Sequence, residues 1–132
     1  MDMRTLGQRR AAQALAAVRK LEANETMGEG YGNFVSYVDR LPASIVMNGL
    51  GQAMATELAA SEPPHRILFD FVEEWLKESG VYPRDMGLMD AIVHGSQEEY
   101  VRAQEEALAY LEWVKKFGHA YLKGGKDAST TL

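Results

Sequence analysis

The sequence of 132 residues contains no cysteine, so it can form neither a disulfide framework nor a thiolate metal site. It also has no apolar run close to the roughly 20 residues that a membrane span needs. Arg9 and Arg10 interrupt the N-terminal region before the apolar segment of a signal peptide could form. These absences favour a cytoplasmic protein in a reducing compartment, with no membrane partner.

Motifs for catalysis and metal binding are absent as well. His65, His94 and His119 lie far apart, and none belongs to an H-x-x-x-H or H-E-x-x-H pattern. Without cysteine there is no thiol nucleophile, and no G-x-S-x-G motif occurs. The glycine-rich residues 28–32 follow no predicted strand and precede no Lys-Ser/Thr pair, so they indicate a loop. We therefore expect no enzyme, no catalytic residues, no metal and no cofactor.

The composition is that of an ordinary globular protein, with 46% hydrophobic and 25% charged residues, which argues against disorder. The chain is long enough for one domain and one core. Its apolar residues recur at helical spacing and do not alternate as they would in strands. We predict an all-α fold, a compact bundle of five to six helices in a single domain over residues 1–122. Residues 123–132 show no periodicity and are expected to form a mobile tail.

Local signals place the ends of the helices. Thr5 with Gln8, and Ser96 with Glu99, form capping boxes that start the first and last helices. Pro42 is expected to separate two helices, because the residue before a proline avoids the helical region and proline suits a first helical turn. The predicted helices span residues 5–22, 31–40, 42–60, 64–80, 84–93 and 96–122.

Residues 41–54, Leu-Pro-Ala-Ser-Ile-Val-Met-Asn-Gly-Leu-Gly-Gln-Ala-Met, are the most distinctive stretch. Their apolar side chains, Val46 and Met47 among them, are predicted to form a wide apolar helix face. Gly49 and Gly51 would each cost a helix interior about 1 kcal/mol relative to alanine, which indicates that something approaches closely there. A neighbouring helix and a strand of nucleic acid are both possible occupants. The candidate seam consists of Asn48, Gly49 and Gln52.

The charge is distributed unevenly along the chain. A net charge of −5 by itself argues against nucleic acid as a partner. However, residues 1–21 hold five basic and one acidic residue, and residues 113–126 hold four basic and no acidic residue. Residues 57–112 hold four basic and thirteen acidic residues. The basic ends could bind phosphate and the acidic middle a basic protein, unless the charges are only scattered and solvated.

Five basic residues are the candidates for RNA phosphate contact. Arg9 and Arg10 lie on the first predicted helix, where an arginine fork could reach two phosphate oxygens, or could merely face solvent. Arg40 is predicted at a helix C-terminus, and Lys115 and Lys116 near the end of the last helix. Cations at these positions could equally serve the helix dipole, at about 0.3–1 kcal/mol each. The outer face of the last helix is expected to include also His119 and Lys123.

Several aromatic residues are considered separately because aromatic rings can stack on bases. Trp75, Trp113, Tyr110 and Tyr121 all recur at helical spacing, and this spacing predicts a place in the core. Contact with nucleic acid is therefore expected through phosphates and not through bases.

Two segments carry a resemblance to a known family. One is Leu-Pro-x-x-Ile-x-x-Asn-Gly-Leu-Gly-Gln, residues 41–52. The other is in the last helix, with Tyr100, Glu-Ala-Leu at 106–108 and Trp-Val-Lys-Lys-Phe at 113–117. In this pattern, which covers roughly residues 4–122, the chain resembles the small subunit of the Cmr effector complex. That complex is the type III-B CRISPR machine for RNA silencing.

The resemblance implies a non-catalytic structural subunit with an all-helical fold. Several copies would form a filament beside the backbone subunits and help to hold guide and target RNA, so the partners would be backbone and large subunits, further copies of the chain, and RNA. The RNA contacts of the family are not a fixed motif, so their assignment to the five basic residues is a hypothesis. A helical adaptor that binds only protein is the main alternative, and a small hydrolase is a third.

Overall fold

The computed structural model describes residues 3–24 and 30–122, which contain six helices and no strand. The predicted all-α class and the number of helices are confirmed. The predicted tail, residues 123–132, lies outside the described residues. None of the helices in the described ranges combines the length and the apolar character needed to cross a membrane. The helices are α1 (Leu6–Glu22), α2 (Gly30–Asn48), α3 (Leu50–Ala59), α4 (Pro63–Glu78), α5 (Leu88–His94) and α6 (Gln97–Tyr121).

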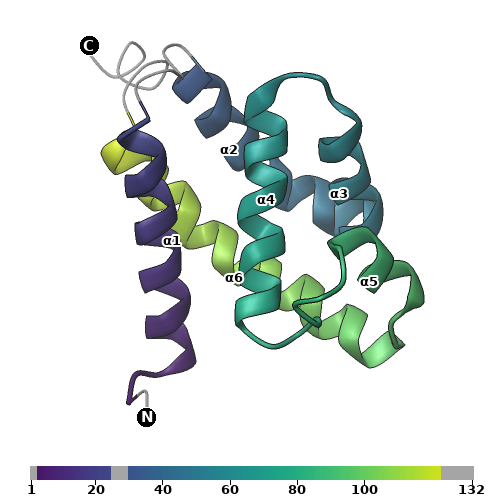
Figure 1. Ribbon diagram of the computed structural model, residues 1–132. Helices are drawn as coiled ribbons and strands as arrows, with labels where there is room; N and C mark the ends of the chain where they lie inside the picture. Colours follow the sequence, from purple (N-terminus) through teal and green to yellow (C-terminus); the bar gives the residue numbers. More distant parts are fainter. Residues whose placement is uncertain (1–2, 25–29, 123–132) are drawn as a thin grey trace.

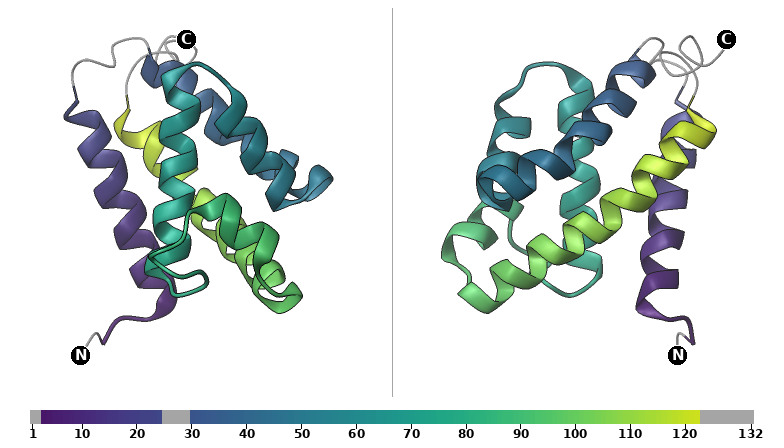
Figure 2. Two further views of the ribbon diagram at one scale, coloured as in Figure 1. Left: turned by 45° about the vertical axis from the view of Figure 1, so that its right-hand side comes forward. Right: turned by 180° about the vertical axis from the view of Figure 1, so that it is seen from behind.

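The long helix α6 is the element against which most of the bundle packs. It crosses one side of the molecule diagonally, and α1, α2 and α4 all contact it (Figures 1 and 2). The C-terminal ends of α1 and α6 and the N-terminal end of α2 lie at one end of the molecule, whereas α3 and α5 lie toward the other (Figure 2). The largest fully buried side chains include Trp75, Tyr110, Phe34, Ile45, Leu50 and Met54.

The helix ends that depend on local sequence signals form as predicted. Thr5 accepts a hydrogen bond from Gln8 N, and the Gln8 side chain accepts one from Thr5 N. The same reciprocal pair joins Ser96 and Glu99 at the start of α6. Gly80 follows α4 with φ +83°, the left-handed conformation expected of a C′ glycine.

The helix break predicted at Pro42 is wrong. Helix α2 continues through Pro42 and ends at Asn48, and the break falls at Gly49, which has φ +88° and ψ 155°. A proline removes one helical hydrogen bond, but Val38, Leu41 and Ile45 form a continuous buried face on both sides of it. The conformation of Gly49 is essentially confined to glycine. Burial of the apolar face therefore outweighs the proline signal, and the chain turns where glycine permits it.

This shift changes which apolar side chains are buried. Val46 and Met47, which belong to the predicted apolar face, are 69% and 81% exposed. They lie in the last turn of α2, on the side that the corner at Gly49 leaves facing solvent, whereas Leu50 and Met54 of α3 are fully buried. The corner thus divides the predicted apolar face between two helices of different direction.

Helix α5 also begins later than predicted, at Leu88 instead of residue 84. Its N-cap, Gly87, has no side chain, and the Glu73 carboxylate of α4 accepts the hydrogen bond of Leu88 N–H at 2.8 Å. Arg84 is paired with Glu74 of α4 at 3.1 Å. The start of α5 is therefore set by contacts with the preceding helix, α4, and not by the residues next to Leu88 in the sequence.

Candidate functional site

Arg10 is bound within the fold, where α1, α4 and α6 meet. Its Nε and Nη2 atoms both donate hydrogen bonds to Glu106 of α6, with Nη2 at 3.1 Å from Oε1. Trp75 of α4 donates its Nε1–H to the same carboxylate at 2.9 Å. The side chains of Arg10 and Glu106 are only 18% and 12% exposed. Arg10 therefore has a structural role, and Arg9, the other predicted arginine of α1, is half-buried.

The charge of Glu106 gives this network a pH dependence. Burial alone would raise the pKa of Glu106, but the hydrogen bonds from Arg10 and Trp75 and the positive charge of Arg10 outweigh burial and lower the pKa below its ordinary value of 4.5. The Glu106 carboxylate therefore stabilises the fold at pH values above its unfolded-state pKa. This contribution is lost as the pH falls through the folded-state pKa.

We expect the difference in unfolding free energy between the wild type and Glu106→Gln to be constant near neutral pH and to shrink below about pH 4.5. Urea denaturation of both proteins over a pH series measures this difference, and other titrating groups cancel in it. A difference that stayed the same down to about pH 3 would show that the Glu106 pKa is not lowered by folding.

Arg40 lies in the interior of α2 and not at a helix C-terminus, so the predicted dipole role is wrong. Its guanidinium carbon is 5.2 Å from the centroid of the Tyr37 ring. Tyr37 in turn stacks on His65 of α4, with ring centroids 3.7 Å apart. His65 Nδ1 is 2.8 Å from Oε1 of the buried Glu57 of α3. Arg40 is exposed and sits at the outer end of a stack that joins α2, α3 and α4.

Lys115 and Lys116 are exposed near the C-terminal end of α6, which leaves both available for phosphate contact. His119, predicted on the same outer face, is half-buried, and its Nε2 is 2.8 Å from Oδ1 of Asp39 in α2. This pair joins α2 to α6, so His119 belongs to the helix packing. Lys123 lies outside the described residues.

The aromatic residues separate into two groups. Trp75 and Tyr110 are fully buried and stacked with ring centroids 5.8 Å apart, as the core prediction requires. Trp113 is 37% exposed and Tyr121 is half-buried, so the core prediction is wrong for Trp113 and only partly right for Tyr121. Trp113 stacks on the half-buried Phe117, four residues farther along α6.

The glycines of the α2–α3 corner are approached by α6. A Cβ atom on Gly49 would lie 2.9 Å from the Tyr100 hydroxyl oxygen. The Gly51 N–H donates to this same hydroxyl, and the Leu50 N–H donates to Gln104 Oε1, both at 3.0 Å. These two N–H groups are in the first turn of α3, where a helix leaves its donors unpaired. Side chains of α6 therefore cap α3, which its own N-cap, Gly49, cannot do.

Asn48 and Gln52, the polar members of the predicted seam, are exposed on either side of this corner. The corner thus presents two exposed amides next to the exposed Val46 and Met47. Contact of this seam with a strand of nucleic acid stays a prediction.

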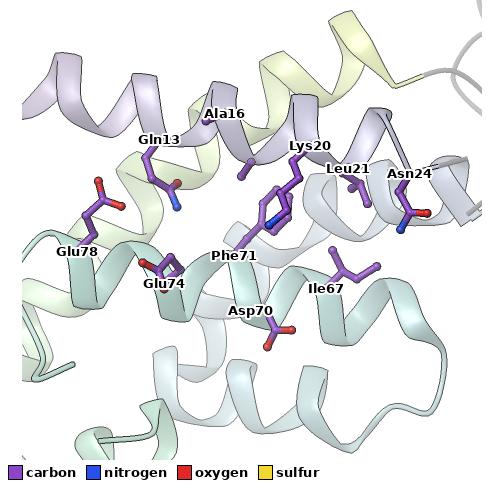
Figure 3. A pocket seen from close by; sticks show the side chains of 11 residues that line it. Gln13, Ala16, Lys20, Leu21, Asn24, Ile67, Asp70, Phe71, Glu74 and Glu78 are labelled. Atoms are coloured by element: carbon purple, nitrogen blue, oxygen red, sulfur yellow. The ribbon is translucent and has the colours of Figure 1, made fainter. Parts of the chain in front are cut away.

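A groove of about 630 Å³ lies between α1 and α4 (Figure 3). Leu21 and Phe71 contribute apolar side chains to it. Asp70, Glu74 and Glu78, four residues apart along α4, line the same groove. Lys20 of α1 lines the groove as well. Three carboxylates and one ammonium group thus lie beside an apolar surface, which is an arrangement suited to a basic partner protein.

The histidines have separate partners. His94 Nδ1 lies 3.0 Å from the carbonyl oxygen of Asp90, while His65 and His119 are bound to carboxylates of α3 and α2. Within the described ranges no three histidine or acidic side chains gather as a metal site.

The structure does not bring the predicted basic residues together in one cluster. Arg10 is within the helix packing, Arg40 is on the α4 side of α2, and the lysine pair is on α6. Arg19 of α1 was not among the predicted residues; its guanidinium carbon is 5.1 Å from the Tyr121 ring centroid of α6. Trp113, Phe117 and Tyr121 recur every four residues along α6, with basic residues between them. This spacing was the signal that could have indicated that aromatic and basic side chains lie side by side on α6.

Comparisons with known proteins agree with one another. Residues 6–121 match the model of the family described as CRISPR-associated protein (Cas_Cmr5). The chain is 30% identical over 122 residues to the CRISPR system Cmr subunit Cmr5 of Thermus thermophilus, covering 92% of this chain and 99% of that protein. It is also similar to the crystal structure of a CRISPR-associated Cmr5 family protein from Thermus thermophilus. The TM-score is 0.71 with 28% identity, over 92% of this chain and 100% of that one.

The family match spans nearly all of the described helices, and the similar crystal structure has the same fold over its whole length. The resemblance to the small subunit of the Cmr machinery is thereby confirmed. This chain belongs to the Cmr5 family of CRISPR-associated proteins.

Proposed function

We propose that this protein is a non-catalytic structural subunit of a type III-B CRISPR effector complex in the cytoplasm, where several copies line up beside the backbone subunits and help to hold guide and target RNA. The family match over residues 6–121 carries this proposal. The relative in Thermus thermophilus is named as a subunit of the Cmr system, and this chain spans 99% of it.

Phosphate contact is assigned to the basic residues outside the helix packing. The exposed Lys115 and Lys116 of α6 are the principal candidates, with the exposed Arg40 as a further one. Basic side chains without base-edge contacts hold a nucleic acid regardless of its sequence, which suits a subunit that serves many guides. Affinity from a few such contacts is low for one copy and rises by avidity when several copies bind one strand.

Protein contacts are assigned to the other surfaces. The acidic groove between α1 and α4 would receive a basic surface of a neighbouring subunit, and Val46 and Met47 at the α2–α3 corner would be covered in the assembly. These same surfaces favour the alternative of an adaptor that binds only protein. The two functions differ in whether the lysines of α6 affect RNA.

Reversing both lysines, Lys115→Glu with Lys116→Glu, is expected to weaken target-RNA retention by the reconstituted complex. The loss of two phosphate contacts should reduce the steepness of log affinity against log salt by about 1.4. For one copy it should weaken the affinity about tenfold at roughly 0.15 M salt. Filter binding or electrophoretic mobility over a salt series measures both quantities.

The matched control is Arg66→Glu with Arg84→Glu, which changes the net charge by the same amount at exposed residues on the acidic side. Arg66 and Arg84 form surface ion pairs with Asp70 and Glu74, so their reversal costs little stability. The proposal requires that only the α6 variant lose RNA. Equal RNA retention by wild type and α6 variant, with normal incorporation into the complex, would favour the protein-only adaptor.

A further inference from the structure

Helix α6 carries a row of aromatic side chains that runs from the edge of the core to the surface. Trp113, Phe117 and Tyr121 are four residues apart, and successive ring centroids are 5.5 and 6.3 Å apart. We call these three residues the α6 aromatic ridge. Trp113 is exposed, and Phe117 and Tyr121 are half-buried. Phe117 and Tyr121 also pack against the edge of the core. Trp113 points farthest from the buried face of α6 and is the ring most open to solvent.

Both ends of the ridge carry a cation. Lys116 Nζ is 6.0 Å from the Trp113 ring centroid, and the Arg19 guanidinium carbon of α1 is 5.1 Å from that of Tyr121. The lysine is at the outer limit of a cation–π contact, and such contacts are weak at exposed positions. The exposed Lys116 side chain can therefore leave the ring and bind a phosphate, which uncovers a face of Trp113.

Aromatic rings in a row with basic side chains beside them are the combination with which proteins bind single-stranded nucleic acid. The rings stack on bases, whereas the cations bind the phosphates that connect them. A duplex keeps its bases stacked inside, so only an unpaired strand can offer base faces to the ridge.

We propose that the α6 aromatic ridge stacks on unpaired bases of single-stranded RNA, while Lys116 and Arg19 bind the adjacent phosphates. This inference rests on the proposed function and adds to it, because phosphate contact alone would not distinguish an unpaired strand from a duplex. The subunit would accordingly bind the unpaired part of an RNA in preference to the paired part.

The tryptophan content of the chain provides a direct test. It contains two tryptophans, and Trp75 is fully buried with its Nε1–H bound to Glu106, so a base can reach only Trp113. Titration of the full chain at low salt with an oligouridylate of about 15 nucleotides, the upper range of known single-strand sites, is expected to quench tryptophan fluorescence. Heparin, a polyanion without bases, and an RNA duplex are expected to bind without comparable quenching.

Variants separate stacking from charge. Trp113→Ala is expected to lower oligouridylate affinity about 5- to 150-fold, the range for loss of one base-stacking aromatic. Trp113→Phe should restore most of the affinity, because a ring remains. Val101→Ala is the matched control, since Val101 is also an exposed apolar residue of α6 and lies about three turns away. Circular dichroism confirms that each variant is folded.

Oligouridylate binding without quenching, with the same affinity for Trp113→Ala, would overturn the stacking inference and leave phosphate contact intact. Equal affinity for single strand and duplex would overturn it too, as would the absence of any RNA binding at low salt. The proposed function is judged separately, by RNA retention in the complex carrying the lysine reversals. The failure of one is therefore distinguishable from the failure of the other.

Discussion

Replacing Glu106 by alanine is expected to lower the free energy of unfolding by about 3 kcal/mol, the lower end of the cost of breaking a buried ion pair. The carboxylate accepts hydrogen bonds from Arg10 and from Trp75, so its loss leaves a largely buried guanidinium and an indole N–H unpaired. The unpaired indole is costly because Trp75 is fully buried, so its N–H cannot reach bulk water. Urea denaturation at pH 7, followed by circular dichroism, measures the change.

Two comparisons make this prediction specific. Glu105→Ala removes an exposed carboxylate one residue earlier and should change stability by no more than about 0.5 kcal/mol. Arg10→Met combined with Glu106→Leu removes both charges and should recover part of the loss, since apolar side chains can replace a buried pair. Equal stability of Glu106→Ala and wild type would mean that the pair contributes nothing. The network also makes Arg10 unsuitable as an RNA probe, because its reversal would place two negative charges together inside the bundle.

Replacing Gly49 by alanine is expected to lower the free energy of unfolding by about 2–3 kcal/mol, since its backbone conformation is essentially confined to glycine. The new Cβ atom would also lie 2.9 Å from the Tyr100 hydroxyl oxygen, which caps α3 through the Gly51 N–H. The substitution therefore strains the corner and displaces the hydroxyl that holds it against α6. The midpoint of urea unfolding reports the loss.

Gly80→Ala is the matched control for backbone strain alone. Gly80 also has a positive φ, +83°, but nothing lies within 4 Å of its added Cβ atom. Gly80→Ala should therefore cost only about 1–2 kcal/mol. Gly49→Ala combined with Tyr100→Phe removes the crowded oxygen, so the two changes should cost less together than the sum of each alone. Strictly additive costs would show that the hydroxyl does not crowd the corner.

The parts of the fold that follow from neighbouring residues could be predicted from the sequence. The capping boxes at Thr5 and Ser96 and the C′ glycine at Gly80 depend on contacts within a few residues, and all three form. The position of the α2–α3 corner could not be predicted, because proline and glycine gave competing local signals. Whether the helix breaks at Pro42 or at Gly49 depended on how well α2 packs against α4 and α6, which lie farther along the chain.

The candidate site was less predictable than the fold. Exposed lysines on α6 could be placed from helical periodicity, and Lys115 and Lys116 are where it put them. The ion pair that holds Arg10 within the fold could not be predicted, because its partner Glu106 lies 96 residues away in the sequence. Nor could the sequence show that Trp75 is buried and Trp113 exposed, since both recur at helical spacing with other apolar residues. The difference arises only from the way in which α1 and α4 pack on α6.

The sequence by itself determined the all-helical class, the absence of cysteine chemistry, most helix ends and the family. These depend on composition, on periodicity and on contacts between near neighbours. The tertiary structure alone decided which charged and aromatic side chains are free to meet a partner. That outcome is set by pairs such as Arg10 with Glu106 and Asp39 with His119, which form only after distant helices have packed together and exclude water from one face of each helix.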